Sequence, residues 1–140
     1  MANASCQRTI ALLKVILRIT SARARILSEN LACAHLDQFT PQDLPVGRLV
    51  DRLEALTDGD QMALVAQLTS MVCEPDNYAG QLLKLDRERY IRYQQEKLLE
   101  NYLNERIARR MLYHCTGHKQ PDQPADRFST YHRLEWRHDG

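Results

Sequence analysis

Potential metal ligands gather near the C-terminal end of the chain. His114, Cys115 and His118 lie within five residues of one another, and His132 and His138 follow near the end of the sequence. Zinc sites usually combine two spaced pairs of ligands, and here the second pair would have to come from histidines in a linker-like stretch. The pattern favours an ordinary histidine and a free thiol at a helix end, and we expect no bound metal or other cofactor.

A thiol nucleophile is a second chemistry that these residues could support. Cys115 directly follows His114, but a catalytic pair needs a base within hydrogen-bond reach of the sulfur and a third group that orients the base. Adjacent residues on a helix point in different directions. The sequence also contains no glycine-rich phosphate loop, no zincin motif and no serine nucleophile elbow. We expect a non-catalytic protein, with a small metal or thiol enzyme as the third alternative.

Two arginine clusters are a stronger indication of function. Both occur on predicted helices, and their members are Arg18, Arg23 and Arg25 in the first cluster and Arg106, Arg109 and Arg110 in the second. Guanidinium groups bind phosphate through paired hydrogen bonds, so both clusters are candidates for contact with a nucleic-acid backbone.

The charge distribution offers these arginines a second kind of partner. Residues 1–28 contain five basic and no acidic side chains, whereas residues 29–76 contain two basic and nine acidic side chains. The net charge is only +1, unlike that of a dedicated nucleic-acid binder. The arginines could therefore pair with the acidic segment, within one chain or between two copies.

Aromatic and arginine side chains in the second half of the chain favour a protein interface. Tyrosine, tryptophan and arginine contribute most to the energetics of such interfaces. The candidate partner-binding residues are Tyr102, Arg106, Arg109, Arg110, Tyr113, Tyr131 and Trp136.

Helices must position these side chains, because only five Gly and five Pro in 140 residues leave little turn material for an all-β fold. Residues 5–36 contain neither Gly nor Pro, and their apolar residues recur at helical spacing around most of the circumference. Such a helix must be covered on several sides, either by the rest of the chain or by a second copy.

The middle of the chain predicts a helical hairpin. Residues 39–45 contain two prolines and are expected to form a loop. Residues 46–57 and 60–73 each carry one apolar face, and the short link between them implies antiparallel helices. Pro75 ends this hairpin, and Asp76 or Asn77 can cap the helix that follows.

Residues 78–114 predict a long fourth helix. A straight helix of this length would exceed about 50 Å at 1.5 Å per residue. Its apolar stripe drifts, with Leu103, Ile107 and Met111 on one side, and residues 86–96 are mostly polar. The helix is therefore expected either to be kinked or broken in that stretch or to project from the core. Gly117 is its expected C-terminal stop.

Together these patterns predict an all-α fold, a small helical bundle of about four helices with a central helical hairpin, a long fourth helix and an irregular C-terminal tail. Residues 1–117 are expected to form the helical domain, and residues 118–140 a linker-like tail that contains aromatic residues.

Cysteine spacing and hydropathy predict a cytoplasmic protein. The four cysteines are not spaced as a metal site or as a dense disulfide framework, which favours free thiols. The most apolar stretch, residues 10–19, contains Lys14 and Arg18 and is too short to span a bilayer.

The predicted function is that of a non-catalytic adaptor or regulatory protein. It would bind another protein through its helical surfaces and its C-terminal tail, and a homodimer through the first or fourth helix is an open option. The alternative is a nucleic-acid-associated regulator, or a replication or packaging accessory factor, that uses the arginine clusters.

Overall fold

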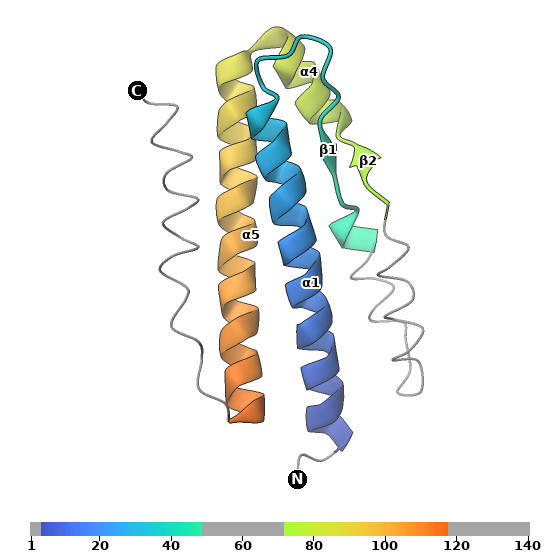
Figure 1. Cartoon of the computed structure of the whole chain (residues 1–140), viewed down its shortest axis with the longest axis vertical. Coiled ribbons are helices and arrows are strands. Elements are labelled where there is room, and N and C mark those ends of the chain that lie inside the picture. Colours follow the sequence, from blue (N-terminus) through green and yellow to red (C-terminus); the bar gives the residue numbers. More distant parts are fainter. Residues whose placement is uncertain (1–3, 49–71, 118–140) are drawn as a thin grey trace.

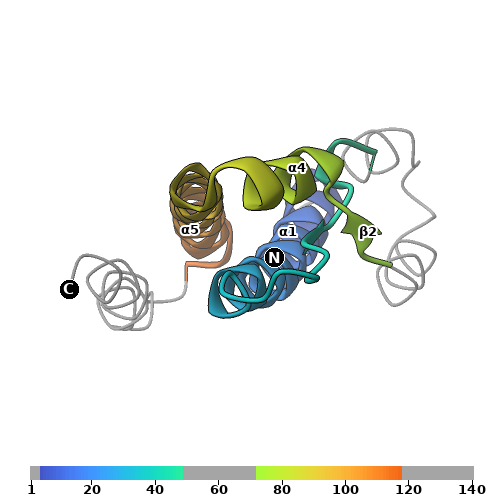
Figure 2. The ribbon, with the colours of Figure 1, turned by 90° about the horizontal axis from the view of Figure 1, so that it is seen from above.

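The computed structural model describes residues 4–48 and 72–117, and these residues are mostly helical. Two long helices, α1 (Ala4–Ala32) and α5 (Arg87–Thr116), lie side by side and run antiparallel (Figure 1). A short helix, α4 (Asn77–Leu85), lies across one end of this pair (Figure 2). The all-α class is confirmed. The central hairpin is described only at residues 46–48, which are helical, and at residues 72 and 73; the rest of it and the tail at 118–140 lie outside the described residues.

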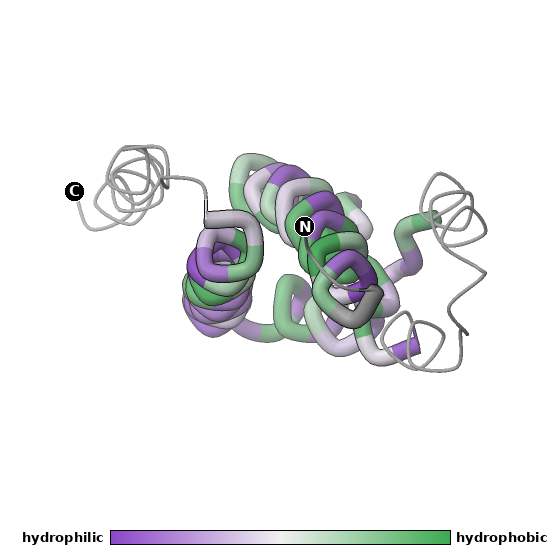
Figure 3. Tube along the Cα trace, turned by 90° about the horizontal axis from the view of Figure 1, so that it is seen from below, coloured by the Kyte–Doolittle hydropathy of each residue, from purple (hydrophilic) through white to green (hydrophobic). Residues whose placement is uncertain are grey.

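The first helix is covered on two sides and open on the third. Its residues Ala24, Leu27 and Leu31 pack against Leu98 of α5. A second group on α1, which includes Val15 and Ile19, packs against Leu44 in the loop that follows. The outer face is exposed, and its residues are Lys14, Arg18, Ser21 and Arg25. Hydrophobic and hydrophilic residues alternate along both long helices (Figure 3), so neither is apolar all round.

The long fourth helix of the prediction is interrupted at Asp86, at the start of the polar stretch. Its backbone N–H donates to Leu82 O at 2.7 Å and closes α4. Its side chain accepts a hydrogen bond from Arg89 N at 3.2 Å and caps α5. An aspartate can satisfy the free N–H groups of a new helix while its own backbone is extended, which explains the break. The predicted stop is confirmed, because Gly117 has a φ of 68° and its N–H donates to Tyr113 O.

Two short strands, which the sequence analysis did not predict, join the loop regions beside α1. They are β1 (Gln42–Asp43) and β2 (Glu74–Pro75), and they pair antiparallel. Proline lacks an N–H group, so the pairing stays short at β2. Immediately after β2, Asp76 accepts a hydrogen bond from Ala79 N and caps α4, so the structure selects Asp76 from the two caps, Asp76 and Asn77, that the sequence allowed. The strand pair thereby brings two aspartates, one in β1 and one after β2, to the side of the helix pair.

Candidate functional site

The acidic groups beside the strands form a charge cluster with residues of both long helices. Arg23 of α1 donates from Nε to Asp43 Oδ1 at 2.9 Å and from Nη2 to Oδ2 at 3.0 Å. Lys97 of α5 donates to Oδ2 of Asp43 at 2.7 Å and to Oδ2 of Asp76 at 2.8 Å. Lys97 also lies over the ring of Tyr93, 4.6 Å from its centroid. The cluster is charge-balanced and links α1, β1, α5 and the start of α4.

Ion pairing fixes the protonation state of this cluster. Burial alone would raise the pKa of Asp43, but hydrogen bonds from Arg23 and Lys97 hold the pKa of that carboxyl below its ordinary value. Burial works against the charge on Lys97, yet its hydrogen bonds to Asp43 and Asp76 raise its pKa. Asp43 and Lys97 therefore stay ionised at neutral pH. The donors and acceptors of the cluster are directed at one another rather than at a ligand.

Polar side chains also occupy the contact between the two long helices, which we call the interior seam. Asn30 is buried and donates to Gln42 O at 2.7 Å and to Gln94 Oε1 at 3.1 Å, and its own oxygen accepts from Gln42 N. Tyr90 donates to Asn30 O at 2.9 Å. Among the described residues, Gln94 Nε2 is the one buried side-chain nitrogen without a hydrogen-bond acceptor. The seam thus fixes the register of β1, α1 and α5.

The seam continues toward the end of α5. Asn101 donates to Thr20 O at 2.8 Å, and both side chains are buried. Glu105 is buried as well and accepts from Arg109 at 2.9 Å. Since polar groups in low dielectric are stable only when paired, these contacts allow one packing of the helices.

Apolar side chains are also exposed on α5. Four of them recur at every fourth position, with exposed fractions between 45% and 57%, and they are Leu99, Leu103, Ile107 and Met111. Residues four apart lie above one another on a helix, with a rotation of about 40° per step. These side chains therefore form a continuous stripe that winds along the helix.

Exposed charged residues flank the stripe, acidic in its first half and basic in its second. They are Glu96, Glu100, Arg106 and Arg110. No salt bridge within the described residues involves any of these four. The outer face of α5, defined as the stripe with these four charged residues, thus offers apolar area and charged groups together, and the charge of Glu100 also acts on Arg23.

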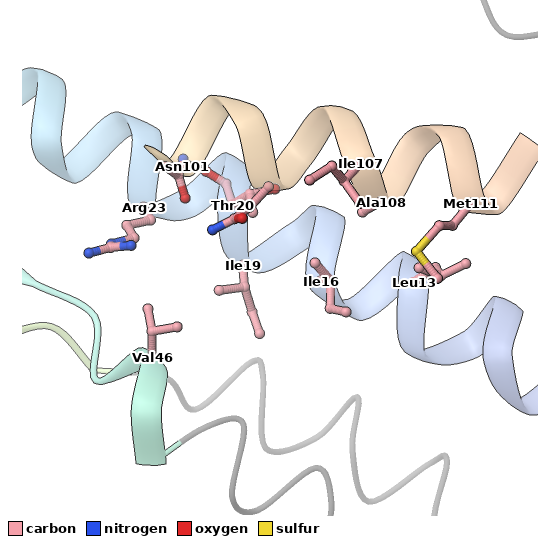
Figure 4. A pocket seen from close by; sticks show the side chains of 11 residues that line it. Leu13, Ile16, Ile19, Thr20, Arg23, Val46, Asn101, Ile107, Ala108 and Met111 are labelled. Atoms are coloured by element: carbon pink, nitrogen blue, oxygen red, sulfur yellow. Dashed lines mark hydrogen bonds between the residues drawn. The ribbon is translucent and has the colours of Figure 1, made fainter. Parts of the chain in front are cut away.

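An apolar pocket of about 280 Å³ adjoins the end of the stripe (Figure 4). The apolar side chains around it come from α1, the residue after Pro45 and α5, and they include Leu13, Ile16, Ile19, Val46, Ile107 and Met111. Ile107 and Met111 belong to both the pocket and the stripe. A side chain of a bound polypeptide could therefore extend from the stripe into the pocket.

The predicted arginines fall into two groups. Arg23 and Arg109 are paired with Asp43 and Glu105, so they are committed within the chain. The exposed ones are Arg18, Arg25, Arg106 and Arg110. Arg18 and Arg25 lie on the outer face of α1, whereas the other two belong to the outer face of α5.

The predicted aromatic residues also differ in placement. Tyr102 is buried, with 4% of its surface exposed, and is part of the core. Tyr113 is half-buried, and its ring meets that of His114 edge to face with centroids 5.7 Å apart. Tyr131 and Trp136 lie outside the described residues. Among the predicted partner-binding residues, Arg106 and Arg110 are exposed together, one turn apart on α5.

The apolar stripe is the part of this surface that sequence reasoning missed. Its signal was present, since Leu103, Ile107 and Met111 recur every four residues. The same spacing is typical of a buried helix face, so spacing alone could not separate core from surface. Only the position of α1 beside α5 shows which residues of α5 it leaves uncovered.

Residues 4–48 and 72–117 contain no group of three or more potential metal ligands, and no helix among them is long and apolar enough to cross a membrane. The four cysteines are not joined by disulfides. The chain matches no protein-family model, and comparisons with curated proteins and with solved structures gave no match.

Proposed function

We propose that the protein is a non-catalytic adaptor or regulator that binds another polypeptide through the outer face of α5. The observation that carries this proposal is the stripe of half-exposed apolar side chains on α5, which includes Leu103. Contiguous exposed apolar surface with a charged rim is characteristic of protein interaction sites. Free cysteines are consistent with this role in the cytoplasm.

Charges beside the stripe define the chemistry of the partner. Arg106 and Arg110 are exposed and unpaired within the described residues, and arginine is enriched among residues that dominate interfaces. A helix of the partner with an apolar face and acidic flanks would cover the stripe and pair with both guanidinium groups. The pocket beside Ile107 and Met111 could accept one apolar side chain from that helix.

Affinity capture with matched variants tests this proposal. The bait is the full chain, offered to a nuclease-treated extract of the cells that produce it, as wild type, Leu103→Asp and Leu85→Asp. Leu85 is 84% exposed but lies outside the stripe, so Leu85→Asp is the control for an exposed charge. We expect a salt-resistant polypeptide that is retained by the wild type and the control and lost with Leu103→Asp. Equal retention by all three baits would contradict the proposal.

A second candidate function is contact with nucleic acid through α1. Lys14, Arg18 and Arg25 are exposed on one face of this helix, and residues 1–28 contain no acidic side chain that could neutralise them. Such a row of cations could contact successive phosphates.

Salt dependence distinguishes this second candidate. Changing Lys14, Arg18 and Arg25 to Gln should weaken binding to duplex or single-stranded nucleic acid and reduce the slope of log affinity against log salt by about 2 to 3. Arg89→Gln with Arg92→Gln is the control, because both residues are exposed on α5 away from this row. Unchanged binding in the triple variant would exclude α1 as the nucleic-acid surface.

A further inference from the structure

We propose that the apolar pocket between α1 and α5 holds the side chain of Trp136, which belongs to the C-terminal tail at residues 118–140 of the same chain. The tail lies outside the described residues. The size and polarity of the pocket, together with the point where the tail begins, indicate this occupant. Since the pocket adjoins the outer face of α5, a docked Trp136 would regulate partner binding there, and this regulatory role rests on the proposed function.

The pocket is large enough for an indole ring. Its volume is about 280 Å³, whereas an apolar cavity of about 150 Å³ already holds a benzene molecule. Two of its apolar side chains, Ile107 and Met111, are about half exposed, so a ring can enter from solvent. Trp136 is the single tryptophan of the chain. Its docking would remove apolar surface of both the ring and the pocket walls from water.

The two ends of the pocket differ in polarity (Figure 4). Thr20 and Asn101 lie at one end, and Leu13 and Met111 lie at the other. Asn101 is buried, with 2% of its surface exposed, and its Nδ2 donates to Thr20 O. Within the described residues its Oδ1 accepts no hydrogen bond, although the oxygen of a buried amide usually does. The pocket therefore combines apolar walls with one available acceptor.

Tryptophan has the chemistry that matches such a pocket. Its indole is apolar apart from one N–H group, which donates a hydrogen bond and accepts none. A buried indole N–H usually finds an acceptor, and Asn101 Oδ1 would supply it here. Trp136 is also the largest of the three aromatic side chains of the tail, the others being Phe128 and Tyr131.

The tail begins close enough to the pocket to reach it. At 1.5 Å per residue, Met111 and Asn101 lie about 9 and 24 Å from Gly117 along α5. Trp136 follows Gly117 by 19 residues, and a chain of that length without regular structure has an r.m.s. span of about 24 Å. A tether whose span matches the distance to its site gives an effective concentration on the order of 1 mM. A contact too weak to form between separate molecules can therefore form within one chain.

A docked Trp136 would compete with the partner for the pocket. Ile107 and Met111 belong to both the pocket and the stripe, so an apolar side chain of the partner and Trp136 would use the same space. The apparent affinity of the outer face would then fall in proportion to the fraction of chains in which the pocket is free. The tail would thus act as an autoinhibitory segment.

Tryptophan fluorescence of the full chain tests the contact without any partner, because Trp136 is the single tryptophan. Ile107→Asp places a charge at the mouth of the pocket. Leu99→Asp is the control, because Leu99 belongs to the stripe but does not line the pocket. The wild type and the control should emit at a shorter wavelength than the same chains unfolded in urea. In Ile107→Asp the native emission should move to the unfolded position, and acrylamide quenching should become about threefold stronger as the ring enters water.

The fold of the variants is checked by circular dichroism, and Met111→Asp is a second pocket variant with the same expected result. Emission that does not depend on protein concentration assigns the contact to one chain. A wavelength shift that appears only as the concentration rises would assign the indole to a second copy and overturn the inference. Wild-type emission at the unfolded position, or unchanged emission in both pocket variants, would overturn it as well.

Capture of a polypeptide tests the regulatory role separately. Trp136→Ala should retain more of the polypeptide that Leu103→Asp loses, because the pocket is then free. Equal or weaker capture by Trp136→Ala would overturn the regulatory role. A docked Trp136 in a chain that captures no polypeptide would keep the contact and reject the proposed function. An exposed Trp136 in a chain that captures a polypeptide through Leu103 would reject the contact and keep the proposed function.

Discussion

The interior seam and the outer face of α5 use the same residue types in opposite ways. In the charge cluster beside the seam, Arg23 is held by Asp43, and in the seam itself buried amides are bonded to backbone groups. On the outer face, Arg106 has no acidic partner within the described residues and lies beside half-exposed Leu103. An arginine in this fold is structural or available for binding according to whether the fold brings a carboxylate to it. We infer that the seam supplies stability and register and that the outer face supplies binding.

The largest expected effect is the loss of a charge from the cluster. Asp43→Asn removes the carboxylate that Arg23 and Lys97 share and leaves both cations largely buried. This loss should lower the free energy of unfolding by about 3 kcal/mol. Urea denaturation measures this change. Asp37→Asn is the control, because Asp37 is 90% exposed and its pair with Arg87 should contribute little. Equal effects of the two changes would remove the distinction between interior and surface charges.

A smaller loss of stability is expected when Asn30 is changed. Asn30→Ala removes the partners of both backbone groups of Gln42 and one partner of Gln94. Leaving these groups unbonded should cost about 2 kcal/mol. Urea denaturation again provides the measurement. Gln81→Ala is the control, because Gln81 is exposed on α4. A stability loss no greater than that of Gln81→Ala would show that the polar seam does not hold β1.

The charge cluster should also make stability depend on pH at the acid end. The pKa of Asp43 is lower in the folded chain than its ordinary value of 3.8. As the pH falls, this carboxyl therefore takes up its proton at a higher pH in the unfolded chain than in the folded chain. The stabilisation is complete above that ordinary value and is lost as the pH falls through the lowered one. Thermal unfolding between about pH 5 and pH 2 should show a steeper loss for the wild type than for Asp43→Asn. Parallel curves would contradict the role assigned to this carboxyl.

The smallest effect on stability is expected on the outer face. Leu103→Gln removes a side chain that is 48% exposed, so the free energy of unfolding should change by less than about 1 kcal/mol. Leu27→Ala in the seam, where the side chain is fully buried, should cost about 3 kcal/mol. Denaturation of both variants side by side measures the difference, and similar losses would place Leu103 in the core instead.

Local signals in the sequence predicted the helices and their ends. The absence of Pro and Gly in residues 5–36, the capping role of Asp76 and the stop at Gly117 depend on neighbouring residues alone, and all three are confirmed in outline. The sequence placed a kink or break within the polar stretch 86–96 but did not identify Asp86 as its position. An aspartate within a helix and an aspartate that caps a helix can have the same sequence neighbours.

The candidate site was harder to predict, because exposure depends on contacts between distant residues. Arg23 and Arg25 are two positions apart and chemically identical, yet only Arg23 is reached by Asp43, which the unpredicted strand pair brings to α1. Tyr102 was expected at an interface and is buried, whereas Leu103 beside it is half-exposed. A pattern of residue types cannot tell which side of α5 faces α1.

Photo-cross-linking from the outer face of α5 tests the central claim most directly. A photoreactive side chain is placed at Leu103 in one full-length chain and at exposed Ala32 of α1 in another, and both are irradiated in nuclease-treated extract. We predict a polypeptide cross-linked at position 103 and none at position 32, with a product of twice the chain's own mass if the partner is a second copy. No polypeptide adduct at 103, or equal adducts at both positions, would contradict the assignment of binding to this face.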